Sequence, residues 1–242
     1  MQTAAIVLAA GAGTRMKSDK PKVAHEVLGK PLVNWVLDAA EEAGIERLVT
    51  VVGHKREQVI PLVEDRAEIV VQEEQRGTAH AVLSCSDALA DFEGSLLVLS
   101  GDCPLITSET MKALIDMRES NDAAVVVLTM EMADPTGYGR IIREADESVA
   151  RIVEQKDASP EEAAVTECNS GFYCFDAKAL FEALGQVGSD NAQGEFYLTD
   201  VLEISRNAGR AVLALPAKDP NECLGINTRE QLAAVEEIAR TR

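Results

Sequence analysis

The 242-residue chain contains few aromatic residues, cysteines and histidines. Aromatic residues make up 4% of it, and its five cysteines and three histidines show neither C-x-x-C spacing nor a metal-ligand pattern. This scarcity excludes a disulfide framework or a zinc cluster and is typical of reduced cytosolic thiols. No apolar run approaches the ~18 residues that a membrane-spanning helix needs. The apolar start also lacks the basic segment that precedes a signal-peptide core. We therefore expect a cytoplasmic protein without a membrane partner.

Positive charge is also scarce. Lys and Arg number 23 against 41 Asp and Glu, which gives a net charge of −18 at pH 7. Such a balance argues against nucleic acid as a partner. An anionic substrate would have to be held by a local group of cations or by a metal ion. The length is enough for one large α/β domain, with room for a smaller lobe.

The cations that are present gather near the N-terminus. Residues 4–9 are apolar and predict a buried strand, and residues 10–14 form a loop of small residues that contains Gly11 and Gly13. Glycine lets the backbone approach a ligand closely and leaves N–H groups free to face oxygens. Four cations follow within eight residues: Arg15, Lys17, Lys20 and Lys22. This pattern favours a polyphosphate site over a plain strand-to-helix turn with solvated lysines.

Two familiar phosphate motifs fail at one position. Both the dinucleotide fingerprint G-x-G-x-x-G and the P-loop G-x-x-x-x-G-K-[ST] require glycine at position 16, where the chain has Met16. A nicotinamide dehydrogenase is therefore disfavoured.

Strands and helices are predicted to alternate as far as residue 130. The predicted strands cover 4–9, 47–52, 68–71, 95–99 and 123–130, and the predicted helices cover 31–43, 55–63, 77–90 and 108–117. Alternation of this kind indicates βαβ units. We expect an α/β fold with a Rossmann-like, mostly parallel sheet and helices on both of its faces.

The pattern changes after residue 132. Short predicted strands at 140–143, 149–154 and 171–175 indicate a smaller antiparallel lobe, followed by a helix at 197–208 and a strand at 211–214. The last segment, 228–242, predicts a helix with a capping box formed by Thr228 and Gln231. We expect a domain of residues 1–227, with a nucleotide-binding half at about 1–132 and a sugar-binding lobe at about 133–227. Residues 228–242 would add a C-terminal helix.

Polar groups follow three of the predicted strands. The ends of parallel strands meet at one edge of a sheet, so the 10–13 loop, Gln72 and Asp102 should share a crevice. The amide of Gln72 suits the edge of a base such as uracil. Asp102 suits Mg²⁺, with Asn227 as a second oxygen donor, although a turn-forming Asp is the simpler alternative.

Several blocks resemble one enzyme family. L-x-A-G-x-G-T-R-M-x-S-D-x-P-K, ending at Lys22, resembles the signature of sugar-1-phosphate nucleotidyltransferases. Residues 21–25 are similar to those of N-acetylglucosamine-1-phosphate uridyltransferases in particular. Further blocks that resemble this family in order are 134–140, 152–158, 169–171, 191–200 and 225–227. The resemblance thus covers essentially the whole chain.

The resemblance implies transfer of UMP from UTP to N-acetylglucosamine 1-phosphate, with pyrophosphate as the leaving group and Mg²⁺ as cofactor. The residues implied for the nucleotide are Ala9, Ala10, Gly11, Gly13, Lys22, Gln72, Gly77 and Thr78. Those implied for the sugar phosphate are Gly139, Glu154, Asn169, Tyr197, Thr199 and Asn227. Asp102 and Asn227 would hold the metal ion, and Arg15 and Lys22 would contact phosphate, so Arg15, Lys22 and Asp102 carry the catalysis.

The chain also departs from that family. Ser100 stands where a tyrosine is common, and Thr228 where a second asparagine is common. The family's hexapeptide-repeat half does not follow, so we expect no acetyl transfer and a monomer. Transfer to another sugar 1-phosphate, use of another NTP, or a non-catalytic UDP-sugar sensor remain as alternatives.

Overall fold

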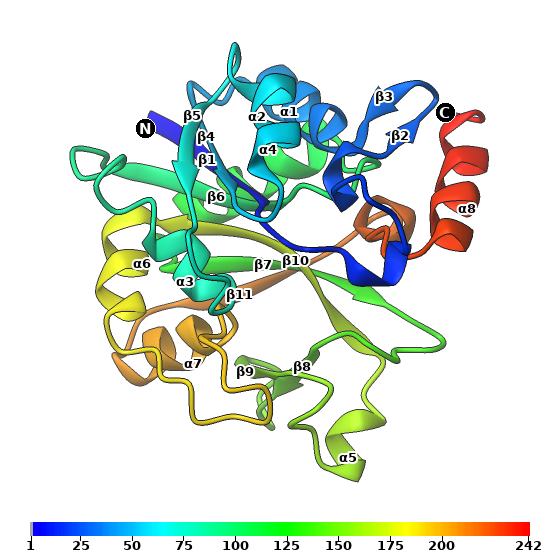
Figure 1. Ribbon diagram of the computed structural model, residues 1–242. Helices are drawn as coiled ribbons and strands as arrows, with labels where there is room; N and C mark the ends of the chain where they lie inside the picture. The colour runs from blue at the N-terminus through cyan, green and yellow to red at the C-terminus, as the bar shows by residue number, and fades with distance from the viewer. Residues whose placement is uncertain (1) are drawn as a thin grey trace.

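The computed structural model describes residues 2–242 as a mixed α/β fold built on one central sheet (Figure 1). The strands are β1 (Gln2–Ala9), β2 (Glu26–Val27), β3 (Lys30–Pro31), β4 (Arg47–Val52), β5 (Glu68–Val71), β6 (Gly94–Ser100), β7 (Val125–Glu131), β8 (Arg140–Arg143), β9 (Val149–Val153), β10 (Glu167–Asp176) and β11 (Val212–Pro216). The helices are α1 (Leu32–Glu42), α2 (Arg56–Val63), α3 (Thr78–Leu83), α4 (Ser108–Ser120), α5 (Pro160–Ala163), α6 (Ala177–Leu184), α7 (Asp200–Asn207) and α8 (Arg229–Ala239). Short 3₁₀ turns cover Thr14–Met16, Lys22–Ala24 and Pro220–Cys223.

The sheet has the strand order β11-β7-β10-β6-β1-β4-β5, and most neighbouring strands are parallel. Successive side chains of a strand point to opposite faces. In β1, Ala4 and Ile6 accordingly pack into one apolar cluster and Ala5 and Val7 into the other. Helices α1, α2 and α4 cover one face, while α3, α6 and α7 cover the other (Figure 1). The predicted fold class is confirmed.

Strand β10 differs from the prediction in length and in place. Residues 171–175 were expected in the antiparallel lobe, but they belong to a ten-residue strand in the middle of the sheet. Tyr173 pairs with Val98 of β6 on one side and with Val127 of β7 on the other, antiparallel to both. Phe172, Cys174 and Phe175 are fully buried. Because both faces and both edges are covered, this strand joins the two parts of the sheet.

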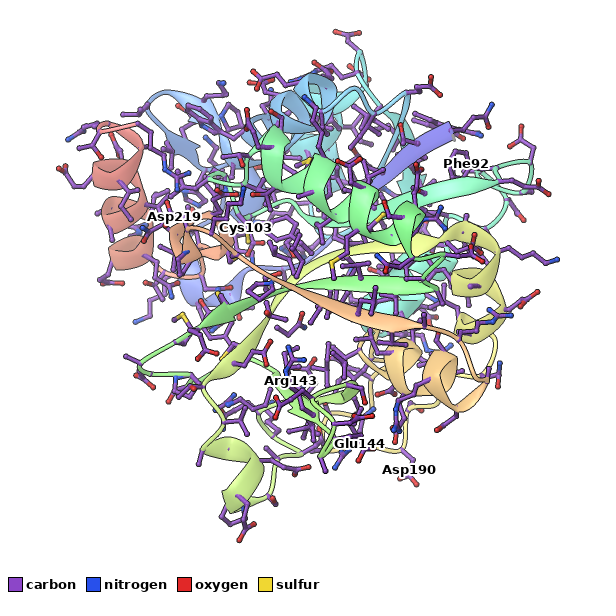
Figure 2. The ribbon with its side chains drawn as sticks, turned by 180° about the vertical axis from the view of Figure 1, so that it is seen from behind. Phe92, Cys103, Arg143, Glu144, Asp190 and Asp219 are labelled. Atoms are coloured by element: carbon purple, nitrogen blue, oxygen red, sulfur yellow. The ribbon has the colours of Figure 1, made fainter. Side chains whose placement is uncertain are left out.

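The hairpin β8–β9 branches from the beginning of β10. Cys168 pairs with Arg140 there, and the hairpin projects away from the main sheet with Arg143 and Glu144 along it (Figure 2). The Arg140 side chain is only 2% exposed, and its guanidinium donates to the carbonyl of Tyr138 and to Gln155 Oε1. A small antiparallel unit is thus present, as the sequence predicts.

Some predicted helix boundaries are wrong. The helix expected to run to residue 90 ends at Leu83, and turns follow. The Ser84 hydroxyl donates a hydrogen bond to the His80 carbonyl. Side-chain bonds of this kind compete with the backbone hydrogen bonds of a helix. The helix expected from Tyr197 begins at Asp200. Helix α6 was not predicted, because its eight residues are too few to show a clear period.

The capping box predicted for the last helix is confirmed. Thr228 accepts from the Gln231 backbone N–H, and the Gln231 side chain accepts from the Thr228 N–H. Because both bonds form, α8 begins at Arg229, and the same Gln231 oxygen also accepts from the Asn227 N–H and so holds Asn227 at the start of the helix.

Candidate active site

A cleft of about 350 Å³ lies at the carboxyl ends of β1, β5 and β6. Its wall is formed by Leu8, Ala10, Gly11, Lys22, Val23, Gln72, Gln75, Gly77, Thr78, Ala81, Ser100, Asp102 and Glu195. The strand ends that the sequence singles out therefore do meet at one crevice. This is the position at which open α/β sheets bind ligands.

At one end of the cleft, Lys22 contacts two side-chain oxygens and shares one of them, Asn227 Oδ1, with Arg15. Lys22 Nζ lies 2.5 Å from Asp102 Oδ2 and 3.0 Å from Asn227 Oδ1. Arg15 donates to the same Asn227 oxygen at 2.9 Å. Four residues chosen from separate parts of the sequence are thus in direct contact. The cluster offers positive charge to a phosphate and oxygen ligands to a metal ion.

Gly13 acts on this cluster through packing. Its φ of +59° is one that a side chain disfavours, and an added Cβ would lie 2.6 Å from the Cβ of Lys22. A glycine at this position lets the 3₁₀ turn that begins at Lys22 fold tightly against the loop. Gly13 itself does not line the cleft.

At the other end, Gln72 is 4% exposed and lies directly after β5. Its Nε2 donates to the Gly77 carbonyl at 3.2 Å and lies 3.0 Å from His80 Nδ1. The apolar groups that accompany it in the wall include Leu8, Ala10 and Ala81. A polar amide edge beside apolar walls is suited to a planar base.

The Gly77–Thr78 turn is bonded to a segment 120 residues away. Phe196 N–H donates to the Arg76 carbonyl and its carbonyl accepts from Ala79, while Leu198 N–H donates to Thr78 Oγ1. Gly77 has a φ of +111°, and a Cβ there would lie 2.5 Å from the Phe196 carbonyl oxygen. Glycine is required for this close approach of two backbones.

The residues proposed for the sugar form a second group. A Cβ on Gly139 would lie 3.5 Å from the Asn169 Cβ and 3.6 Å from Glu154 Oε1, and the Gly139 carbonyl accepts from the Asn169 N–H. Thr199 Oγ1 donates to Glu154 Oε1 at 3.2 Å. Tyr197 lies apart from these contacts and donates its hydroxyl proton to Asp157 at 3.2 Å.

Burial raises the pKa of Glu154, and Asp157, Asp200 and Glu195 add repulsion against its charge. The hydrogen bond from Thr199 opposes this shift. Burial likewise raises the pKa of Asp200. A carboxyl that is costly to ionise can accept or donate a hydrogen bond, which suits the hydroxyl groups of a sugar.

Not every implied residue borders the main cleft. Ala9 packs into the core at 2% exposed, whereas its neighbour Ala10 lines the cleft. Arg15 borders a second hollow of about 450 Å³, whose other lining residues are Met16, Lys17, Thr228, Arg229 and Glu230. Six further residues of the cleft wall were not expected from the sequence: Leu8, Val23, Gln75, Ala81, Ser100 and Glu195. Ala81 could have been found, because it lies one helical turn after Gly77.

The donor atoms near Lys22 fit a hard divalent cation. Across residues 2–242, no three His, Cys, Asp or Glu side chains are grouped as a metal site. Mg²⁺ commonly takes only one or two protein oxygens and completes its shell with water and substrate phosphate. The Asp102 carboxylate and the Asn227 carbonyl oxygen both face the Lys22 ammonium, so they already surround one cationic centre.

No helix within residues 2–242 is long and apolar enough to cross a membrane.

Residues 5–208 match the family model of the MobA-like NTP transferase domain.

Curated relatives are about 50% identical to the chain over the aligned residues. The bifunctional protein GlmU of Geobacillus sp. (strain WCH70) is 50% identical over 238 residues, which is 98% of this chain and 52% of that protein. The GlmU protein of Corynebacterium efficiens is 52% identical over 96% of this chain and 49% of its own length. The chain therefore spans about half the length of the curated relatives it matches.

A solved UDP-glucose pyrophosphorylase in complex with UDP-glucose superposes with a TM-score of 0.79. The match covers 100% of this chain and 99% of that one at 20% sequence identity. At this identity the likeness concerns the fold.

Proposed function

The chain belongs to the family of MobA-like NTP transferase domains and is a nucleotidyltransferase; from that premise we propose that it transfers UMP from UTP to N-acetylglucosamine 1-phosphate. The products are UDP-N-acetylglucosamine and pyrophosphate. The observation that carries the proposal is the contact of Lys22 with both Asp102 and Asn227, beside a cleft that Lys22, Asp102 and Gln72 all line. The GlmU relatives, about 50% identical, support this choice of substrates.

In the proposed reaction, an oxygen of the sugar phosphate attacks the α-phosphorus of UTP. The bond from that phosphorus to the bridging oxygen breaks on the opposite side, and the electron pair leaves with pyrophosphate. No side chain has to act as a nucleophile, so the protein contributes position and charge. Lys22 and Arg15 would stabilise the negative charge that develops on the phosphate oxygens, at the place where they now meet Asn227.

Mg²⁺ would be held by Asp102 and Asn227, and when bound it would neutralise phosphate charge and orient the reacting groups. The uracil would lie against Gln72, Ala10 and the Gly77–Thr78 turn. The sugar would be bound by Gly139, Glu154, Asn169 and Thr199.

We place the reaction in the cytoplasm, where its product would serve cell-wall synthesis.

The test is pyrophosphate release measured for each pair of NTP and sugar 1-phosphate, with and without Mg²⁺. We expect turnover with UTP and N-acetylglucosamine 1-phosphate to exceed every other pair. If another pair were preferred, the protein would still be a nucleotidyltransferase, but the substrates proposed here would be wrong. Tight binding of UDP-N-acetylglucosamine without any pyrophosphate release would instead identify a sensor.

A further inference from the structure

The carboxamide of Gln72 has a defined orientation in the cleft. Its Nε2 lies 3.2 Å from the Gly77 carbonyl oxygen and 3.0 Å from His80 Nδ1. A backbone carbonyl can only accept, so the atom that faces it must be the amide nitrogen. The two hydrogens of that nitrogen are thereby directed at Gly77 and His80. The carboxamide oxygen is left for a ligand in the cleft.

His80 must accept in this arrangement, and that fixes its tautomer. A hydrogen on Nδ1 would point at a hydrogen of the amide, so the ring proton has to reside on Nε2. His80 is half-buried on α3, one turn from the Gly77–Thr78 turn that borders the same cleft. Of the two acceptors that hold the amide, one is backbone and the other is this imidazole.

The orientation of an amide decides which pyrimidine it can pair with. Uracil carries a hydrogen on N3, between two carbonyl oxygens, whereas the N3 of cytosine is an acceptor with an amino group beside it. An amide oxygen accepts from the N3–H of uracil but faces a lone pair at the same position of cytosine. A flipped amide would reverse this preference.

We propose that His80 is a specificity-determining residue. It holds the Gln72 carboxamide with its oxygen toward the base and so favours a uridine nucleotide over a cytidine nucleotide. This inference rests on the proposed function, in which the base lies against Gln72. His80 acts through Gln72 and needs no contact with the nucleotide, so it is a positioning residue.

A purely structural role would have a different signature. If the imidazole only tied the end of β5 to α3, its loss would weaken turnover with every nucleotide in the same proportion. Positioning of the amide instead predicts a change in the ratio of kcat/KM for UTP to kcat/KM for CTP. That ratio is the quantity to measure.

Two substitutions separate the roles. His80→Asn can keep an acceptor near the place of Nδ1, whereas His80→Leu fills similar space and offers none. We expect His80→Leu to lower the UTP to CTP ratio on the order of tenfold or more, since one directed hydrogen bond is worth about that factor. His80→Asn should restore most of the ratio. Ser84→Ala, on the same segment and bonded to the His80 carbonyl, is the matched control and should leave it unchanged.

The outcomes distinguish this inference from the function on which it rests. An unchanged ratio in folded His80→Leu, while the wild type prefers UTP, overturns the inference and leaves the function standing. A wild type that releases no pyrophosphate, or that prefers CTP, overturns both. If His80→Leu does not fold by circular dichroism, His80→Ala carries the same test, and an unchanged ratio there has the same meaning.

Discussion

Lys22 Nζ donates to Asp102 Oδ2 across a sequence separation of 80 residues, and Asn227 completes the contact from the far end of the chain. The side chains of Lys22 and Asp102 are 19% and 15% exposed. Because water is largely excluded from this pair, removal of either partner leaves the other charge poorly compensated. The pair is therefore where a small chemical change should have a large effect.

Asp102→Ala should lower the rate of pyrophosphate release on the order of 10²–10³, as the loss of a charge-stabilising group commonly does. The carboxylate supplies the charged oxygen in the contact with Lys22 and Asn227, so both metal affinity and the position of Lys22 depend on it. Asp91→Ala is the control, since Asp91 is 83% exposed and pairs with Arg47. Near wild-type turnover in Asp102→Ala, measured across Mg²⁺ concentrations, would refute the metal assignment.

Glu154→Gln should change the dependence of stability on pH. Burial raises the pKa of Glu154, so the folded protein retains this proton to a higher pH than the unfolded chain, whose glutamates titrate at about 4.3. The stability that this side chain contributes is therefore present below the unfolded pKa and is lost as pH rises through the folded pKa. We expect Glu154→Gln to unfold at higher urea than the wild type at neutral pH, with no gain at about pH 4.

Glu162→Gln provides the opposite case in the same experiment. Its pKa is lowered, chiefly by the hydrogen bond from the Ser159 backbone N–H, so its contribution is present above the unfolded pKa and is lost as pH falls. The variant should be less stable than the wild type at neutral pH, with the difference closing in acid. If the stability difference from the wild type, measured by urea unfolding, changed with pH in the same direction for both variants, both pKa assignments would be contradicted.

Gly77→Ala should weaken UTP binding and lower stability together. The added methyl would lie 2.5 Å from the Phe196 carbonyl at a φ that side chains disfavour, so the two backbones must separate. Gly188→Ala is the control, since nothing lies within 4 Å of its added Cβ. We expect KM for UTP to rise at least tenfold in the first variant only, read from initial rates. An unchanged KM would mean that the turn does not contact the nucleotide.

Arg140→Ala should raise KM for the sugar phosphate more than KM for UTP. Its guanidinium donates to Tyr138 and Gln155, and it also reaches the Ala163 carbonyl. Tyr138 and Gln155 are the chain neighbours of Gly139, just before β8, and of Glu154, just after β9. The loss removes the charged donor from the half-buried Tyr138 and Ala163 carbonyls, at a cost of about 1–3 kcal/mol each, and leaves Gln155 Oε1 with the Gly137 N–H. Arg143→Ala, half-buried on the same hairpin and paired with Glu167, should affect stability without this bias in KM (Figure 2). Equal effects on both substrates would place the sugar elsewhere.

Alkylation of the five cysteines should be slow in the folded protein. All five are buried, and burial raises the pKa of Cys85, Cys174 and Cys223 to about 12, so little thiolate forms. Cys103 adjoins Asp102, and burial also raises its pKa well above that of a free thiol (Figure 2). Mass spectrometry after iodoacetamide should show modification that UTP with Mg²⁺ slows. Rapid alkylation of Cys103 with unchanged turnover would contradict the placement of the cleft, and Cys103→Ala should keep most activity.

The strand ends could be predicted from the sequence because they follow from local patterns. An apolar run ending in Gly101 and Asp102, or in Gln72, identifies the edge of a parallel sheet, and the topology then brings such ends together. The contacts of Asn227 with Arg15 and Lys22 could not be derived in this way, since no local pattern joins the two ends of the chain. Asn227 was identified by its resemblance to a family motif, and its contacts with Arg15 and Lys22 became visible only in the structure.

The place of β10 was beyond local reasoning for a related reason. Its residues read as a short strand among other short strands, and only pairing decides that Tyr173 lies between β6 and β7. The wall residues Gln75, Ser100 and Glu195 were missed because exposure to a cleft depends on backbone direction, which composition does not reveal. Helix α3 ended early because Ser84 and its neighbours favour turns over the apolar period that suggested a longer helix.

The position of β10 also sets an order of assembly. The chain reaches β7 before β10, yet β10 lies between β6 and β7, so a growing polypeptide that has emerged only as far as β7 exposes two strand edges without partners. Such edges adhere to other chains, and pairing between distant segments is slow. At roughly 5–20 residues per second on the ribosome, the gap stays open for several seconds. The yield of soluble protein in a cell therefore depends on whether the unpaired edges of β6 and β7 avoid other chains until β10 has been synthesised.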